Sequence, residues 1–166
     1  MHSSELTQTF QTLLTKRLEG IDPEKIVVVG VGNRMRSDDA IGLVLLDALR
    51  DVLFHLIDAG TTPEEYLSII KRLDPEVIIF LDALERGFPP GTICIVEKGD
   101  ILPHHENSHY LSLNILLEYL IMETGADVFI IGIQYGTISF GSGLSPEVEE
   151  GVLICAKIMR EVIFKS

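Results

Sequence analysis

A glycine-rich turn carrying two adjacent acids follows directly on an apolar run near the start of the chain. Residues 26–29 read Ile-Val-Val-Val, and residues 30–42 read Gly-Val-Gly-Asn-Arg-Met-Arg-Ser-Asp-Asp-Ala-Ile-Gly. A buried strand that ends in glycines and then opens an acidic helix places carboxylates at the rim of a parallel sheet, where open α/β folds bind their ligands. The pattern therefore predicts an α/β fold with its functional site at that rim.

Apolar runs and helical periodicities alternate along the rest of the chain. The expected strands are residues 26–29, 53–57, 77–81, 92–96 (peripheral) and 128–133, and the expected helices are residues 1–20, 41–52, 62–73, 110–122 and 145–163. This alternation predicts a single-domain, three-layer α/β/α sandwich, with a mostly parallel twisted sheet and helices on both faces. We assign residues 1–166 to that domain, with residues 1–20 as an N-terminal helical extension.

The composition argues against several function classes. The formal charge of −12 disfavours nucleic acid and anionic membranes as partners, because phosphate binding needs clustered Lys and Arg. The sequence has no apolar run of the ~18 residues that a membrane span needs, and residues 1–20 lack a signal-peptide core, which predicts a cytoplasmic protein. Cys94 and Cys155 lie far apart in apolar segments, so we expect buried thiols rather than a disulfide or a metal cluster.

Three aspartates are candidates for chemistry at the predicted rim. Asp39 lies in the glycine-rich turn, and Asp58 and Asp82 follow the expected strands 53–57 and 77–81. Neighbouring strands lie about 4.8 Å apart, so these side chains can converge on one ligand. Two carboxylates about 4 Å apart repel by on the order of 4 kcal/mol in a protein-like dielectric, so such a cluster favours a bound proton or cation.

Each of these acids also has a purely structural interpretation. Helix capping and compensation of the helix dipole would explain one of Asp38 and Asp39. Hydrogen bonds to the backbone of the turn at residues 59–61 explain Asp58 best. For Asp82 we favour a functional role, because it follows five apolar residues, where a carboxylate without partners would be unfavourable.

Histidines and known motifs narrow the chemistry further. His104 and His105 lie in a polar loop, and His109, at the start of the next helix, is the best-placed histidine for a ligand. The sequence does not match the dinucleotide-binding fingerprint G-x-G-x-x-G, because Met35 occupies the position of its third glycine. The sequence contains neither an H-E-x-x-H zinc motif nor a G-x-S-x-G nucleophile elbow.

Several motifs, in order, resemble those of the hydrogenase maturation endopeptidases, the proteases that trim the large subunit of hydrogenases. They are residues 30–42, 58–61 (Asp-Ala-Gly-Thr), 81–83 (Leu-Asp-Ala), 90–92 (Pro-Gly-Thr), 108–113 (Ser-His-Tyr-Leu-Ser-Leu), 132–134 (Gly-Ile-Gln) and 143–146 (Gly-Leu-Ser-Pro). The resemblance covers residues 26–164, and the adjacent pair of aspartates looks like the formate-hydrogenlyase, or hydrogenase 3, type of the family.

The resemblance implies an endopeptidase, either aspartic-type or nickel-dependent, that removes the C-terminal peptide of a nickel-loaded precursor of the large subunit of a nickel–iron hydrogenase. Nickel would be borne by this substrate and recognised through Asp39, Asp82 and His109, with Asp39 and Asp82 also catalytic. The residues expected to contact the substrate are those of the glycine-rich motifs: Gly30, Gly32, Asn33, Asp58, Gly60 and Thr61.

The sequence leaves two mechanisms of cleavage open and allows alternatives to the endopeptidase function. A nickel-activated water and a carboxylate acting as general base on a free water would use the same residues. A non-catalytic nickel-binding factor that holds the precursor would use the same ligands without cutting. A nucleotide-binding α/β protein is disfavoured, because an acidic rim repels phosphate.

Overall fold

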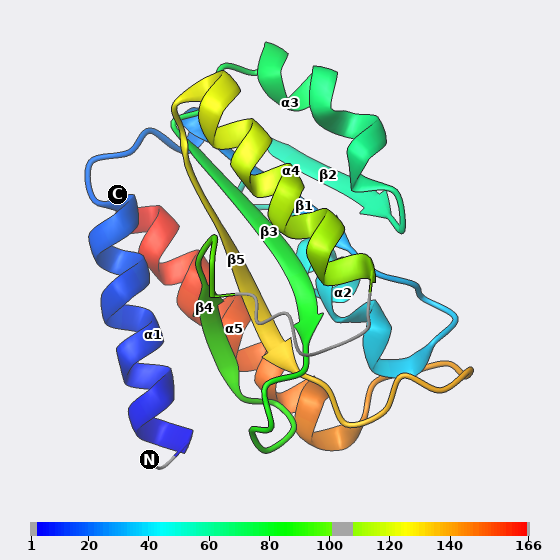
Figure 1. Ribbon diagram of the computed structural model, residues 1–166. Coiled ribbons are helices and arrows are strands. Elements are labelled where there is room, and N and C mark those ends of the chain that lie inside the picture. Colours follow the sequence, from blue (N-terminus) through cyan, green and yellow to red (C-terminus); the bar gives the residue numbers. More distant parts are fainter. Residues whose placement is uncertain (1–2, 101–107, 166) are drawn as a thin grey trace.

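A five-stranded sheet forms the centre of the protein, whose computed structural model describes residues 3–100 and 108–165, with the side chains of residues 4–100 and 112–165. The strands are β1 (Ile26–Val31), β2 (His55–Gly60), β3 (Val77–Leu84), β4 (Ile93–Val96) and β5 (Asp127–Gln134), in the order β2-β1-β3-β5-β4. Four strands are parallel, and β4 runs antiparallel to β5 at one edge (Figure 1). The mostly parallel sheet and its peripheral fourth strand are confirmed.

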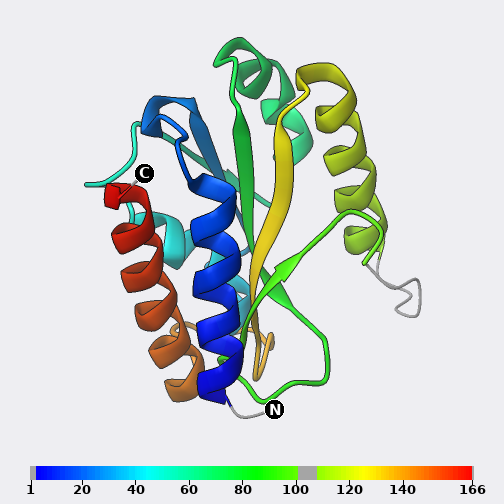
Figure 2. The same ribbon diagram turned by 90° about the vertical axis from the view of Figure 1, so that its left-hand side faces the viewer.

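Helices cover both faces of this sheet, as Figures 1 and 2 show. On one face lie α1 (Ser3–Leu18), α2 (Ile41–Asp47) and α5 (Pro146–Lys165), and on the other lie α3 (Leu67–Arg72) and α4 (Ser108–Thr124). Short 3-10 helices occur at η1 (Pro23–Lys25), η2 (Ser37–Ala40) and η3 (Pro63–Tyr66). The predicted three-layer α/β/α architecture is therefore confirmed.

The central strands are apolar along most of their length because both of their faces are buried. In β1, Val28 packs in the cluster under α1, α2 and α5, whereas Val27 and Val29 pack in the cluster under α3 and α4. Every residue of β1 and β3 is buried. Parallel strands covered on both sides require such runs, which is why the apolar segments were recognisable in the sequence.

The N-terminal helix is an integral part of the core. Phe10, Leu14 and Leu18 of α1 are buried, and α1 lies beside α5 and β4 (Figure 2). Arg17, on the same side of the helix, places its guanidinium 4.3 Å from the centre of the Phe129 ring. Burial of three large apolar side chains stabilises the fold by about 2 kcal/mol each, so residues 3–18 contribute to the same folding unit as the sheet.

Two predicted helices differ from the structure. The helix expected over residues 41–52 ends at Asp47 and continues as turns, and the helix expected over residues 62–73 begins as η3 before α3. Pro63 occupies the expected first position, but Thr62 makes no side-chain cap and instead donates its hydroxyl to Glu65 at 3.3 Å. Within the described part of the chain, none of the helices has the length and apolar character needed to cross a membrane.

Both cysteines are free thiols, as the sequence predicts. Cys155 is completely buried and Cys94 is half-buried, and burial raises the pKa of each thiol. A protonated thiol in an apolar environment is a poor nucleophile. Cysteine chemistry therefore has no place in the candidate site.

Candidate functional site

Three neighbouring strands bring the predicted motifs to one edge of the sheet. Gly30 of β1 pairs with Asp58 of β2 on one side and with Leu81 of β3 on the other. Asp82 lies one residue beyond that row. The parallel register thus places the glycine-rich turn, the 58–61 turn and Asp82 at the same carboxyl end of the sheet, where open α/β folds bind ligands.

Close backbone packing explains two glycines of the first motif. A Cβ atom on Gly42 would lie 2.2 Å from the Leu81 carbonyl oxygen, and one on Gly32, which has a φ of +151°, would lie 2.1 Å from the Asp39 carbonyl oxygen. Only glycine fits at such contacts. The Asn33 N–H also donates to the Asp39 carbonyl oxygen at 3.0 Å. These contacts hold the backbone of Asp39 beside the strand ends, and η2 packs directly against β3.

Asp38 has a structural role. Its buried carboxylate accepts four hydrogen bonds: from the Ser145 N–H (2.7 Å) and hydroxyl (2.6 Å), and from the N–H groups of Gly136 (2.8 Å) and Thr137 (2.9 Å). Burial acts to raise the pKa of Asp38, but these hydrogen bonds outweigh it and hold the pKa below the usual Asp value. Neither η2 nor α2 has a side-chain cap, so Asp38 fastens η2 to the loop before α5 instead of capping a helix.

Asp39 is half-buried and lies near a polar cluster, of which only Gln134 belongs to a motif recognised in the sequence. Burial raises the pKa of Tyr135, helped by the charge of Glu85, by a hydrogen bond to Glu85 and by the charge of Asp39. The buried Gln134 side chain donates to the Glu85 carboxylate at 3.3 Å and accepts from the Arg86 N–H at 2.8 Å. The available sequence signal was the pair of polar residues that directly follows the buried run 128–133.

Asp82 lies inside β3 rather than beyond its end. The expected strand end at residue 81 is wrong, because pairing with β5 continues to Leu84. The Asp82 side chain is 2% exposed, and its Oδ1 accepts a hydrogen bond from the Ala83 N–H at 2.8 Å. Side chains alternate along a strand, so Asp82 shares the sheet face of Phe80, which α3 and α4 cover. An ionised carboxylate at this depth needs donors or a cation to compensate its lost hydration.

Asp58 lies inside β2 rather than beyond the expected strand end at residue 57, and its carboxylate has two structural partners at the surface. Its Oδ1 accepts from the Gly60 N–H at 3.2 Å, and its Oδ2 accepts from Arg34 at 3.2 Å. Arg34 also forms an ion pair with Asp47 at 2.9 Å. These contacts agree with the turn-stabilising interpretation of Asp58. The substrate-binding role stays a prediction for the whole set of Gly30, Gly32, Asn33, Asp58, Gly60 and Thr61.

His109 lies in the first turn of α4, the helix that covers the sheet face carrying Asp82. Its side chain, and the whole of His104 and His105, lie outside the described residues. Among the side chains that the structure describes, no group of three His, Cys, Asp or Glu is arranged to hold a metal ion. The ligand set of Asp39, Asp82 and His109 includes a side chain beyond that range, so it stays a prediction.

The sequence matches the family model described as hydrogenase maturation protease over residues 45–161. It is also similar to the hydrogenase 3 maturation protease of Escherichia coli K12. The two are 30% identical over 130 residues, which cover 76% of this chain and 83% of the relative.

Solved structures of such proteases share the fold. The NiFe hydrogenase maturation protease HycI from Thermococcus kodakarensis KOD1 superimposes with a TM-score of 0.81 at 27% identity, covering 92% of this chain and 99% of that one. The hydrogenase maturating endopeptidase HybD from E. coli gives a TM-score of 0.70 at 24% identity, covering 85% and 93%. The sheet edge described above is therefore part of a scaffold common to these proteins.

Proposed function

Because this chain belongs to the hydrogenase maturation protease family, we propose that it removes the C-terminal extension from a nickel-loaded precursor of a nickel–iron hydrogenase large subunit. Family membership establishes an endopeptidase of hydrogenase maturation. The nickel, the residues that recognise it and the cytoplasmic site of processing belong to the proposal.

The observation that supports this proposal most directly is the different placement of two adjacent acids. Asp38 uses both carboxylate oxygens to hold the loop before α5. Asp39 is half-buried, and the glycines at 32 and 42 allow its backbone to lie against the ends of β1 and β3. Since β3 also carries the buried Asp82, the fold fixes two acids near one edge of the sheet, as a two-carboxylate site requires.

Asp39, Asp82 and His109 form the site that we propose for the nickel ion of the substrate. Two carboxylates and an imidazole make a donor set of borderline hardness that leaves coordination positions open for ligands from the precursor. Without the cation, the two carboxylates repel each other. A nickel-loaded precursor therefore binds this site more tightly than an unloaded one, and nickel acts as a recognition tag carried by the substrate.

Asp39 and Asp82 are also the catalytic residues of the proposal. As water attacks the peptide carbonyl it must lose a proton, which either a carboxylate accepts or a metal ion makes more acidic. The first route is that of an aspartic-type peptidase, and the second is nickel-dependent. Single-turnover pH profiles with nickel- and cobalt-loaded precursors distinguish them: a profile that shifts with the metal indicates metal-activated water, and a fixed profile indicates the carboxylate.

The test of the proposed function is the length of the nickel-loaded precursor on a gel after mixing with the protein. Wild type should shorten it, and Asp39→Asn, Asp82→Asn and His109→Ala should each abolish shortening while the circular dichroism spectrum is retained. Asp51→Asn, at an exposed acid paired with Arg160, serves as the control and should process normally. Full processing by any of the three site variants would refute the assignment, and binding without shortening would indicate a precursor-holding factor instead.

A further inference from the structure

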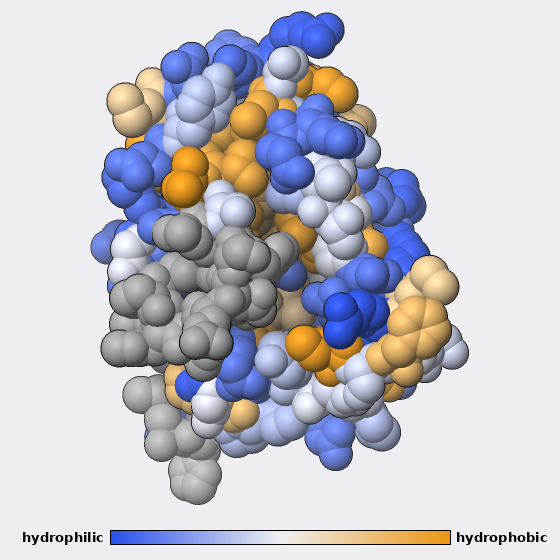
Figure 3. All heavy atoms as spheres, turned by 45° about the vertical axis from the view of Figure 1, so that its right-hand side comes forward, coloured by the Kyte–Doolittle hydropathy of each residue, from blue (hydrophilic) through white to orange (hydrophobic). Residues whose placement is uncertain are grey.

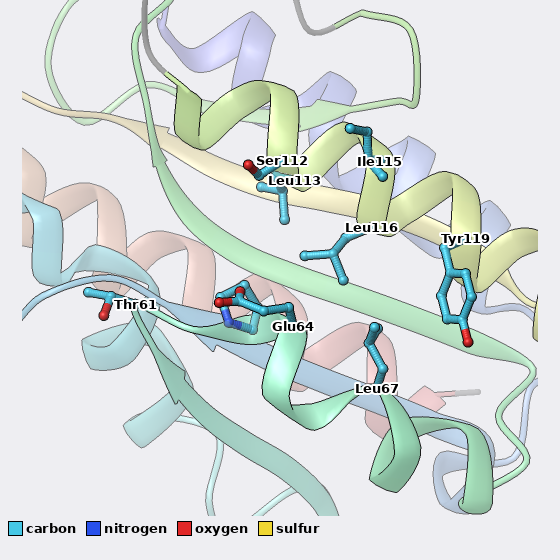
Figure 4. Close-up of a pocket in the computed structure, with 9 residues that line it drawn as sticks. Thr61, Glu64, Leu67, Ser112, Leu113, Ile115, Leu116 and Tyr119 are labelled. Atoms are coloured by element: carbon cyan, nitrogen blue, oxygen red, sulfur yellow. The ribbon is translucent and has the colours of Figure 1, made fainter.

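An apolar groove runs between α4 and the segment formed by η3 and α3 (Figure 4). Its volume is about 610 Å³. Side chains from both walls line it, among them Thr61, Glu64 and Leu67 on one side and Ser112, Ile115 and Tyr119 on the other. Because neither Asp39, Asp82 nor the glycine-rich turn at residues 30–42 lines this groove, it is separate from the site proposed for the metal ion.

One end of the groove opens at the edge of the sheet that carries the candidate site. Thr61 directly follows β2, in which Asp58 pairs with Gly30 of β1. Across the groove, Ser112 lies about one helical turn beyond His109 in α4. The groove therefore begins next to the residues proposed for nickel binding and leads away from them between the two helical segments.

The other end of the groove is held by polar contacts that join its walls. The Lys71 amine of α3 donates to the Tyr119 hydroxyl of α4 at 2.9 Å and lies 5.2 Å from the centre of the same ring. Lys71 also lies 3.9 Å from the Glu123 carboxylate. These contacts join α3 to α4 across this end of the groove.

Large apolar side chains on one wall are exposed to solvent, and Figure 3 shows hydrophobic (orange) atoms at the surface of the molecule. Ile115 is 60% exposed and Tyr119 is 38% exposed, while Leu113 and Leu116 are buried beneath them. Exposed apolar groups that line a concave surface mark an interaction site, because burying them against a partner is favourable. The surface is suited to a chain with apolar side chains.

We propose that this groove binds an apolar segment of the precursor polypeptide adjacent to the bond that is cut, an inference that rests on the proposed function. A polypeptide whose scissile bond lies at Asp39 and Asp82 must continue over the protein surface, and the groove begins at the same edge of the sheet. Glu64 stands on the rim, and the net charge of the chain is −12. The complementary segment therefore carries apolar side chains and at least one basic residue.

The test compares two substitutions of exposed apolar residues on opposite faces of the sheet. Ile115→Glu places a charge in the groove, and Leu153→Glu places the same charge on α5, where the leucine is 66% exposed. With nickel-loaded precursor, Ile115→Glu should raise KM at least about tenfold with little change in kcat, which is the pattern of lost substrate binding. Leu153→Glu should match wild type, and both variants should melt near the wild-type temperature because neither site is buried.

Two outcomes separate this inference from the proposed function. If wild type shortens the precursor and Ile115→Glu has an unchanged KM, the groove proposal is overturned and the function stands. If wild type shortens no precursor, the proposed function is refuted. The groove proposal is then tested by measuring the equilibrium binding of fluorescently labelled, nickel-loaded precursor. A loss of affinity in Ile115→Glu but not in Leu153→Glu supports the groove proposal, and equal affinity of Ile115→Glu and wild type overturns it.

A second copy of this chain is the main competing occupant. Light scattering of wild type and Ile115→Glu tests it directly. A wild-type dimer that the substitution converts to monomer would assign the groove to self-association and overturn the proposal, whereas the same mass for both proteins supports a precursor segment.

Discussion

The hydroxyl of Ser145 donates a 2.6 Å hydrogen bond to the carboxylate of Asp38, 107 positions earlier in the chain. The same carboxylate also accepts the backbone N–H of Ser145 and those of Gly136 and Thr137. Asp38 thus connects the turn after β1 with the start of α5. The turn after β1 and the segment before α5, which are far apart in the sequence, therefore form one structural unit, and that unit positions Asp39.

Asp38→Asn should destabilise the protein. The amide replaces one acceptor oxygen with a donor that faces N–H groups, so at least one hydrogen bond to a charged acceptor is lost in a buried place. We expect the free energy of unfolding in urea to fall by about 2–3 kcal/mol. Ser145→Ala, which removes only the hydroxyl donor, should lower it by about 1–2 kcal/mol. Equal stability of Asp38→Asn and wild type would contradict the structural role of this carboxylate.

The stabilising effect of Asp38 should disappear in acid. Its pKa in the folded protein is below the value of about 3.9 expected in the unfolded chain. The contribution is therefore complete above the unfolded pKa and is lost as the pH falls through the folded pKa. The stability difference between wild type and Asp38→Asn, measured by urea denaturation, should be constant from about pH 5 to 8 and shrink below about pH 4. A stability difference that widens on acidification would show that folding raises the pKa of Asp38 instead of lowering it.

Gly42→Ala should disrupt the edge of the sheet. The new methyl group would lie 2.2 Å from the Leu81 carbonyl oxygen and 2.3 Å from that of Val31, so backbone must move. We expect a loss of at least about 3 kcal/mol in the free energy of unfolding, the range of severe overpacking. Gly20→Ala is the matched control: its φ is +73° but nothing lies within 4 Å of the added carbon, so it should lose only about 1–2 kcal/mol. Similar losses for the two variants would argue against tight packing at Gly42.

The parts of the fold that could be predicted from sequence are those set by local pattern. The runs around β1 and β3 are apolar because both faces are covered, and this constraint is visible residue by residue. The end of β3 was missed because it depends on pairing with β5, about 50 residues further on. Hydrophobic pattern identifies a strand, but its last residues are decided by its neighbours.

Local sequence pattern locates the motif of the candidate site, whereas only the resemblance to the family selects Asp39 within it. Asp38 and Asp39 are chemically identical neighbours, and local sequence does not distinguish them. Their environments differ because the carboxylate of Asp38 accepts hydrogen bonds from Gly136, Thr137 and Ser145, contacts that only the folded chain creates. The proximity of Tyr135 to Asp39 was not predictable for the same reason, since the two residues are 96 positions apart in the sequence.

Nickel on the precursor should determine how tightly this protein binds it. We expect wild type to bind nickel-loaded precursor about 5–150-fold more tightly than unloaded precursor, the usual range for coupling between two binding events. In the proposed site, the cation would offset the repulsion between the carboxylates of Asp39 and Asp82, and both carboxylates would become its ligands. Fluorescence anisotropy with labelled precursor, in both forms, measures the ratio of the two Kd values without requiring cleavage.

The same measurement on Asp39→Asn isolates the contribution of that carboxylate to nickel preference. The variant lacks one charged ligand and also lacks the repulsion with Asp82, so its affinity for unloaded precursor should be unchanged or higher, and its nickel preference should fall toward one. Asp51→Asn, at an exposed acid that pairs with Arg160 on α5, should keep the wild-type ratio. If Asp39→Asn keeps that ratio as well, nickel is recognised elsewhere and the proposed ligand set is incorrect.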